Sequence, residues 1–199
     1  MAIKKSHKVT GSIVGAAMIC TPLVAQFEGL WTTAKPDKLA YGLPTVCYGE
    51  TEGVKVGDTY TKAECDAMLA KKLPRYLKSA LSCINVPVSD KQLAAYGSLT
   101  YNIGEKAFCR STVVNRLNSG DYIGSCNAMM SWVNAGGKRV QGLANRRAKE
   151  RELCLEGITD TTPLEFPKGH KELADAPDKL RTNTWWAKML HFFARWGKT

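Results

Sequence analysis

Apolar residues recur at spacings of three and four through the middle of the chain, a pattern that predicts helices packed against a common core. Two of these stretches open with a capping box, in which a Ser or Thr is followed three residues later by Glu or Gln: Thr61 with Glu64, and Ser89 with Gln92. Further helices are predicted from Ser111, from Asp121 and over residues 142–155. The larger part of the chain is therefore expected to be helical.

Residues 42–60 follow a different pattern, with short β-prone pieces at residues 45–48 and 54–56. Polar and turn-forming residues separate the two pieces, which predicts a small hairpin or sheet. The expected fold class is α+β, with this small β element beside a larger helical lobe.

The first 26 residues carry the pattern of an export signal. Lys4, Lys5 and Lys8 precede an uncharged stretch over residues 9–25. Gly, Ser, Thr and Pro residues dilute this stretch, which is slightly shorter than the roughly 20 residues that span a bilayer comfortably. No cleavage site with small residues at both key positions is evident, so residues 1–26 are expected to form a weak, uncleaved signal anchor. The alternative is an N-terminal core helix of a cytosolic protein.

The C-terminal part differs from the body in composition. Residues 158–180 contain three prolines and little apolar periodicity, which predicts a linker or a loosely packed strap. Residues 181–199 place Trp and Phe side chains on one face of a helix and basic side chains on the other, a pattern typical of an interfacial membrane helix. A terminal helix docked on the body would show the same periodicity.

Charge and cysteine usage narrow the partners and the compartment. The formal net charge of +10 favours an anionic polymer or surface, such as nucleic acid, acidic lipid or bacterial envelope. Seven cysteines without a CxxC spacing argue against a zinc site. Six lie in the body and allow three disulfides in an oxidising compartment such as a periplasm, with fifteen connectivities open, while Cys20 is the odd one out. Buried free thiols are the alternative.

Carboxylate chemistry is what remains for catalysis, because the three histidines lie near the chain ends and no phosphate-binding glycine motif occurs. The informative strings are FEGLWTTAKPD over residues 27–37 and GLPTVCYGET over residues 42–51. They resemble the active-site segment of the phage-type lysozymes, glycoside hydrolase family 24. Matching strings follow in the same order, and the resemblance spans roughly residues 27–157: YTKAEC at 60–65, LTYNIG at 99–104, NRLN at 115–118, and two arginines followed by a glutamate at 146, 147 and 150.

This resemblance implies a lysozyme-like catalytic domain over residues 27–157 that hydrolyses the bond between N-acetylmuramic acid and N-acetylglucosamine. Glu28 would be the general acid, beside apolar neighbours that favour its protonated form. Asp37 and Thr45 would orient the attacking water on the opposite face, giving inversion, and no cofactor or metal is expected. Arg146 or Arg147 would be the basic partner of Glu28.

One departure from the family pattern concerns Asp37. Seven residues separate Asp37 from Thr45, where the family usually has five, and a loop absorbs two extra residues at little energetic cost. The nearby acids Glu50 and Glu52 lie in a turn and are expected to be solvated.

The anchor placed directly before Glu28 further resembles the signal-anchor-release endolysins. The resemblance implies a protein tethered to the periplasmic side of the host inner membrane and then released into the periplasm, with peptidoglycan as substrate. A monomer is expected, and no nucleic-acid partner is expected because no recognised nucleic-acid-binding motif accompanies the positive charge. The C-terminal helix would contact outer-membrane lipid. Two alternatives stay open: a non-enzymatic protein that disrupts membranes or binds cell walls, and a lytic transglycosylase, which also needs one acid but forms 1,6-anhydro sugars.

Overall fold

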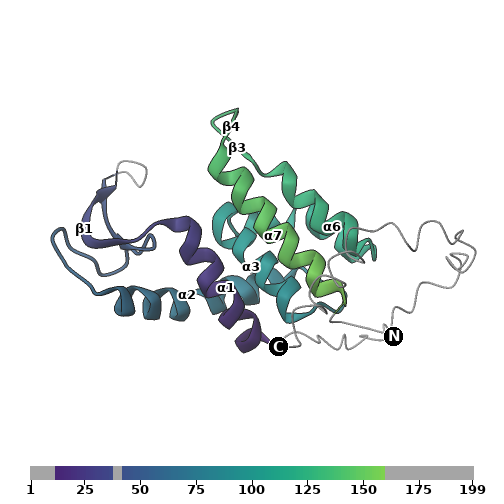
Figure 1. The fold of residues 1–199 in the computed structure, drawn as a ribbon, viewed down its shortest axis with the longest axis horizontal. Helices are drawn as coiled ribbons and strands as arrows, with labels where there is room; N and C mark the ends of the chain where they lie inside the picture. Colours follow the sequence, from purple (N-terminus) through teal and green to yellow (C-terminus); the bar gives the residue numbers. More distant parts are fainter. Residues whose placement is uncertain (1–11, 38–41, 160–199) are drawn as a thin grey trace, which may run out of the picture. The chain divides into compact units, whose positions relative to one another are not determined.

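The computed structural model describes residues 12–37 and 42–159. Within these ranges, helices form most of the molecule and two short antiparallel strand pairs accompany them, which confirms the expected α+β class (Figure 1). The elements, in chain order, are α1 Ile13–Glu28, β1 Trp31–Asp37, β2 Leu43–Cys47, α2 Lys62–Ser82, α3 Asp90–Ile103, α4 Glu105–Cys109, α5 Thr112–Asn118, α6 Tyr122–Ala128, the 3₁₀ turn η1 Met129–Ser131, β3 Asn134–Ala135, β4 Lys138–Arg139 and α7 Gln141–Thr159.

The helix starts lie where the capping residues predicted them. In both capping boxes, the hydroxyl of the first residue accepts the backbone N–H three positions on, and the side chain there accepts the N–H of the capping residue. Ser111 and Asp121 cap α5 and α6 in the same way with one side-chain bond each. The predicted C-terminal helix of the body is α7, which continues to Thr159.

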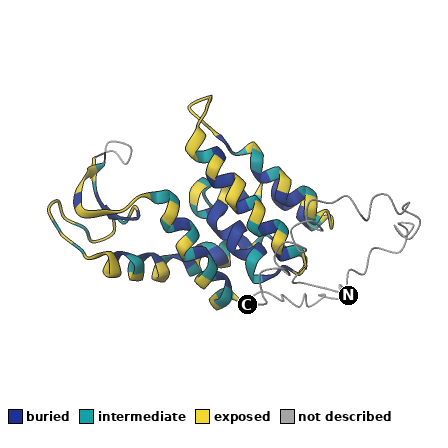
Figure 2. Ribbon diagram, in the orientation of Figure 1, coloured by how far each residue is buried: buried dark blue, intermediate teal, exposed yellow. Residues whose placement is uncertain are grey.

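Helix α3 is the centre of the core. Its residues from Gln92 to Thr100 are all buried, and α1, α2 and α7 pack around it (Figure 2). Two disulfides fasten the surrounding helices, Cys83–Cys109 and Cys126–Cys154, and a third, Cys47–Cys65, joins β2 to α2. The six body cysteines therefore pair as three bridges, and Cys20 is buried and unpaired.

Most of helix α1 belongs to the segment expected to be a membrane anchor, yet the helix contributes to the core. Ala16, Cys20 and Val24 recur every fourth residue and are fully buried, while Val14 and Met18 on the outer side are 70% and 75% exposed. Across residues 12–37 and 42–159, no helix combines the length and apolar character needed to cross a bilayer. The helix runs without a break through the expected domain boundary at residues 26 and 27 and ends at Glu28.

The β region differs from the expectation in two respects. The first strand of the hairpin is β1, which precedes the predicted β segment and pairs antiparallel with β2. Residues 54–56 form no strand, because their neighbourhood closes on itself: the Lys55 N–H donates to the Asp58 carboxylate, and the Asp58 N–H donates to the Lys55 carbonyl. A turn uses up the backbone groups that a β ladder would need.

The remaining expectations about the chain ends stay predictions. The linker at 158–180 lies outside the described residues except for its first two, which belong to α7, and the basic amphipathic helix at 181–199 lies wholly outside them.

Candidate active site

Glu28 is the last residue of α1, at the junction of the helical body and the β1–β2 hairpin (Figure 1). Gly29 follows it with φ of 72°, a left-handed conformation that favours glycine and turns the chain out of the helix toward β1. The Glu28 side chain is 22% exposed, so its carboxyl is mostly withdrawn from water but still reachable from outside.

Arg146 is the basic partner of Glu28. Its Nη1 lies 2.6 Å from the Glu28 Oε1, its side chain is only 3% exposed, and its guanidinium lies 5.8 Å from the ring of Phe27. Of the two arginines that the sequence offered for this role, Arg146 takes it, and Arg147 pairs with Glu150 instead.

Glu150 completes a group of charges that we call the charge cluster: Glu28, Arg146, Arg147 and Glu150. The Glu150 side chain is fully buried, and its Oε1 accepts hydrogen bonds from Arg146 Nε at 3.0 Å and from Ser98 Oγ at 2.6 Å. Its Oε2 lies 2.8 Å from Arg147 Nη1. The sequence pattern contained this signal, since positions three and four apart share a helix face and Glu150 is four residues after Arg146 and three after Arg147.

Burial and the neighbouring charges shift the pKa values of Arg146, Arg147 and Glu150. Burial works to lower the pKa of Arg146, but the carboxylates of Glu150 and Glu28 outweigh it and raise that pKa. Burial lowers the pKa of Arg147, and burial raises the pKa of Glu150 against the pull of both guanidinium groups. Arg146 is therefore the firmly charged centre between two carboxylates.

Asp37 and Thr45 lie on neighbouring strands of the hairpin. Asp37 pairs with Leu43 and Lys35 with Thr45, so the Asp37 and Thr45 side chains emerge on the same face as diagonal neighbours, about 7–8 Å apart by general sheet geometry. Thr45 is only 6% exposed, and its hydroxyl donates to the Leu43 carbonyl at 3.1 Å. The Gly42 N–H donates to the Asp37 carbonyl at 2.7 Å and closes the connection, whose residues 38–41 lie outside the described ranges.

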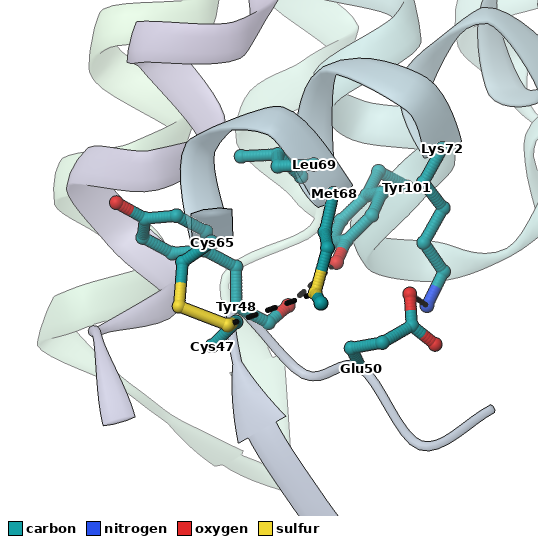
Figure 3. Close-up of a pocket in the computed structure, with 8 residues that line it drawn as sticks. All are labelled: Cys47, Tyr48, Glu50, Cys65, Met68, Leu69, Lys72 and Tyr101. Atoms are coloured by element: carbon teal, nitrogen blue, oxygen red, sulfur yellow. Dashed lines mark hydrogen bonds and ion pairs between the residues drawn. A yellow bond between two sulfur atoms is a disulfide. The ribbon is translucent and has the colours of Figure 1, made fainter. Parts of the chain in front are cut away.

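A small pocket lies where the end of β2 meets α2 and α3 (Figure 3). The Tyr101 hydroxyl donates to the Tyr48 carbonyl at 2.7 Å there, and the Cys47–Cys65 disulfide forms part of the wall. None of Glu28, Asp37 and Thr45 lines this pocket, whose lining residues are Cys47, Tyr48, Glu50, Cys65, Met68, Leu69, Lys72 and Tyr101.

Glu50 is not the solvated acid that its position in a turn suggested. Its side chain is 18% exposed, lies 3.3 Å from Lys72 Nζ, and accepts the backbone N–H groups of Thr51 and Glu52. Burial works to raise the pKa of Glu50, but these hydrogen bonds and Lys72 outweigh it and lower that pKa. Glu50 therefore fastens the turn to α2, whereas Glu52 is exposed as expected.

Metal ligands are not clustered in the described part of the chain: no three His, Cys, Asp or Glu residues there are close enough together to hold an ion. The expectation that no cofactor or metal is needed stays a prediction.

Comparison with known proteins places this site in a family context. The sequence model described as phage lysozyme matches residues 25–150. The chain is 42% identical over 123 residues to the SAR-endolysin of Enterobacteria phage P21, covering 61% of this chain and 74% of the relative, and 37% identical over 158 residues to the SAR-endolysin of Pseudomonas phage phiKMV, covering 77% and 95%. The structure matches the muramidase domain of SpmX from Asticaccaulis excentricus with a TM-score of 0.64 and 28% identity, over 75% of this chain and 98% of that domain.

Proposed function

The chain belongs to the phage lysozyme family and is a glycoside hydrolase that degrades peptidoglycan for host lysis. From this premise, we propose that it is an inverting N-acetylmuramidase with Glu28 as its general acid. The bond cleaved is the β-1,4 bond between N-acetylmuramic acid and N-acetylglucosamine. The observation that carries the proposal is the environment of Glu28. Its carboxyl is largely buried at the end of α1 and is held by one guanidinium, and two residues separate it from the strand that leads to Asp37. The similarity to a muramidase domain supports the choice of bond.

Each of the three side chains has one task in the reaction. Glu28 donates its proton to the glycosidic oxygen as the bond to the leaving sugar breaks. Asp37 accepts a proton from the water that attacks the anomeric carbon from the opposite face. The Thr45 hydroxyl hydrogen is already donated to the Leu43 carbonyl, so the lone pairs of Oγ1 are left to accept the second hydrogen of that water and orient it.

Product analysis tests this reaction against its competitors. Purified peptidoglycan should release fragments with a hydrated N-acetylmuramic acid at the reducing end, and NMR taken during the first turnovers should show the inverted anomer. Fragments ending in 1,6-anhydro sugar would establish a lytic transglycosylase instead. A protein that lyses cells yet releases no soluble fragments from purified walls would be the non-enzymatic alternative.

The route to the substrate is proposed from α1. The similarity to SAR-endolysins supports a tethered state in which the N-terminal segment lies in the host inner membrane and the rest of the protein lies on the periplasmic side. The protein would later be released into the periplasm. The same segment supplies Ala16, Cys20 and Val24 to the core beneath Glu28. Residues in the membrane cannot fill the core at the same time, so the tethered protein would lack α1 packing and the aligned Glu28–Arg146 pair.

Fractionation with and without membrane depolarisation tests this route. Full-length protein should move from the membrane to the soluble fraction on depolarisation, with activity appearing at the same time. Soluble, active protein before depolarisation would contradict the proposal. Size-exclusion chromatography of the released protein should give a monomer.

The segment at 181–199 is proposed to contact outer-membrane lipid, on the strength of its Trp, Phe and basic residues. Deleting it should reduce lysis of cells from outside while leaving hydrolysis of purified peptidoglycan unchanged. Equal loss of both activities would contradict the proposal.

A further inference from the structure

The proposed reaction does not use Glu150, whose carboxyl group is fully buried. The side chain of Arg146 lies between Glu150 and the catalytic acid Glu28 and contacts both. The Glu150 Oε1 accepts hydrogen bonds from Ser98 Oγ and Arg146 Nε, and its Oε2 lies 2.8 Å from the cationic Arg147 Nη1. These donors and cations favour the ionised carboxylate and so oppose burial, which raises the pKa of Glu150.

Arg146 connects the two carboxyl groups physically. Its Nη1 holds Glu28 at 2.6 Å, its Nε holds Glu150 at 3.0 Å, and its Nη2 donates to the carbonyl of Ser98 on α3 at 3.2 Å. Because three separate groups engage one planar guanidinium, its orientation is fixed, and the position offered to Glu28 is fixed with it.

The cluster is electrically balanced only when both carboxyl groups are ionised. Two arginines and two carboxylates then sum to zero, whereas a protonated Glu28 leaves one positive charge. Without the charge of Glu150, protonating Glu28 would leave two positive charges at the site, and the general acid would lose its proton more readily.

We propose that Glu150 is a positioning residue for the catalytic acid: it orients Arg146 toward Glu28, and its negative charge offsets one of the two arginine charges beside Glu28. This inference rests on the proposed role of Glu28 as general acid.

Within the described part of the chain, two helices contribute charged or titratable groups that interact with Glu28. Arg146 and Arg147 belong to α7, and Tyr101 belongs to α3. Burial raises the pKa of Tyr101, whose hydroxyl donates to the Tyr48 carbonyl, so Tyr101 is neutral over the working range. Tyr101 therefore adds no charge to the cluster over that range.

The test is the pH dependence of hydrolysis by a small set of variants on purified peptidoglycan. In an inverting hydrolase the alkaline limb of the profile reports loss of the proton from the general acid. Glu150→Gln, which keeps the shape and removes the charge, should move this limb toward lower pH by about one unit. Glu150→Asp keeps the charge and should leave the limb near its wild-type position even where the rate falls.

Arg147→Gln gives the opposite sign, because it removes a positive charge from the same cluster and should move the alkaline limb upward. The matched control is Glu152→Gln, on the same helix, where the side chain is 58% exposed and pairs with Lys149. That variant should leave the profile unchanged, since solvent screens its charge. If Arg147→Gln fails to fold, the positions of the alkaline limb in Glu150→Gln and Glu150→Asp are sufficient to test the inference.

A purely structural role for Glu150 has a different signature. It would lower the thermal midpoint and the rate at every pH while leaving both limbs in place, and that result would overturn the inference. Glu28→Gln distinguishes failure of the proposed function from failure of the role proposed for Glu150. If it retains turnover, the proposed function fails; if it loses turnover while the limb of Glu150→Gln stays fixed, only the role of Glu150 fails.

Discussion

Arg146 is the residue on which the site depends most directly. It is 3% exposed and lies between two carboxylates, so its charge is offset on both sides without help from solvent. Removing a charge from such an arrangement leaves its partners buried and unpaired, which costs far more than the intact arrangement contributes.

Replacing Arg146 with Gln should therefore lower the free energy of unfolding by about 3–5 kcal/mol at neutral pH. Urea unfolding followed by circular dichroism measures the difference. The matched control is Arg116→Gln, whose partner Asp121 lies at 2.8 Å but whose pair is 51% and 44% exposed, and it should cost about 0–1 kcal/mol. Equal losses in the two variants would show that burial of the cluster does not decide its strength.

Cys20 gives a second prediction at this scale. Burial raises the pKa of its thiol to about 12, and the nearby Glu150 adds to the effect. The folded, released protein should therefore resist alkylation at about pH 8, while unfolding without reductant should expose one reactive thiol per chain. Mass spectrometry after iodoacetamide treatment counts the thiols, and fast labelling of the folded protein would contradict the buried position.

At the scale of elements, local signals in the sequence were sufficient for the capped helices, but they missed the short helix α4, which has no side-chain cap, and they were insufficient for the sheet. The capping residues Thr61 and Ser89 predicted helix starts because a cap needs only a side chain and its next few backbone groups. The sequence analysis missed β1 because this strand is stabilised by pairing with β2, which lies later in the chain. Most of the β1 side chains are also exposed, so they show no alternation of buried and exposed positions. Residues 54–56 have β-prone side chains, but the Asp58 carboxylate accepts the Lys55 N–H and stabilises a turn there instead of a strand.

The contribution of the Glu50–Lys72 contact, which joins the turn after β2 to α2, can be measured through the pH dependence of stability. The pKa of Glu50 is lowered from the ordinary value of 4.5, so the folded protein binds the proton less readily than the unfolded chain. The stability it contributes is present above that ordinary value and is lost as the pH falls through the lowered pKa. Glu50→Gln should cost about 1 kcal/mol at neutral pH, and the difference from wild type should vanish in acid. Glu52→Gln, an exposed neighbour, should show neither effect.

At the scale of the whole molecule, the candidate site joins residues that are distant in sequence, and this is where sequence reasoning reached its limit. The motif around Glu28 and the pair at 146 and 147 indicated which residues belong together, but only packing of α7 beside the end of α1 decides that Arg146 rather than Arg147 meets Glu28. Similarly, no local pattern shows that the segment expected to be an anchor also supplies the core, because both roles require apolar residues.

That double role predicts a way to hold the protein in the membrane without harming its fold. Gln26 is exposed on α1, so Gln26→Leu should raise the apolar character of the anchor while leaving the core unchanged. The membrane-bound fraction should rise and lysis should be delayed. Gln141→Leu makes the same substitution at an exposed position on α7 and should alter neither. Fractionation and lysis timing of both variants provide the measurement, and equal behaviour would argue against release of this segment.

One carboxyl group, that of Glu28, is proposed to supply the proton for bond cleavage. The most direct measurement is the rate of reducing-end release from purified peptidoglycan by Glu28→Gln, with Glu52→Gln as an exposed acid-to-amide control and circular dichroism to confirm that both fold. Glu28→Gln should lose about 10²–10⁴-fold in rate, and the control should keep the wild-type rate. Wild-type turnover by a folded Glu28→Gln protein would contradict this proposal.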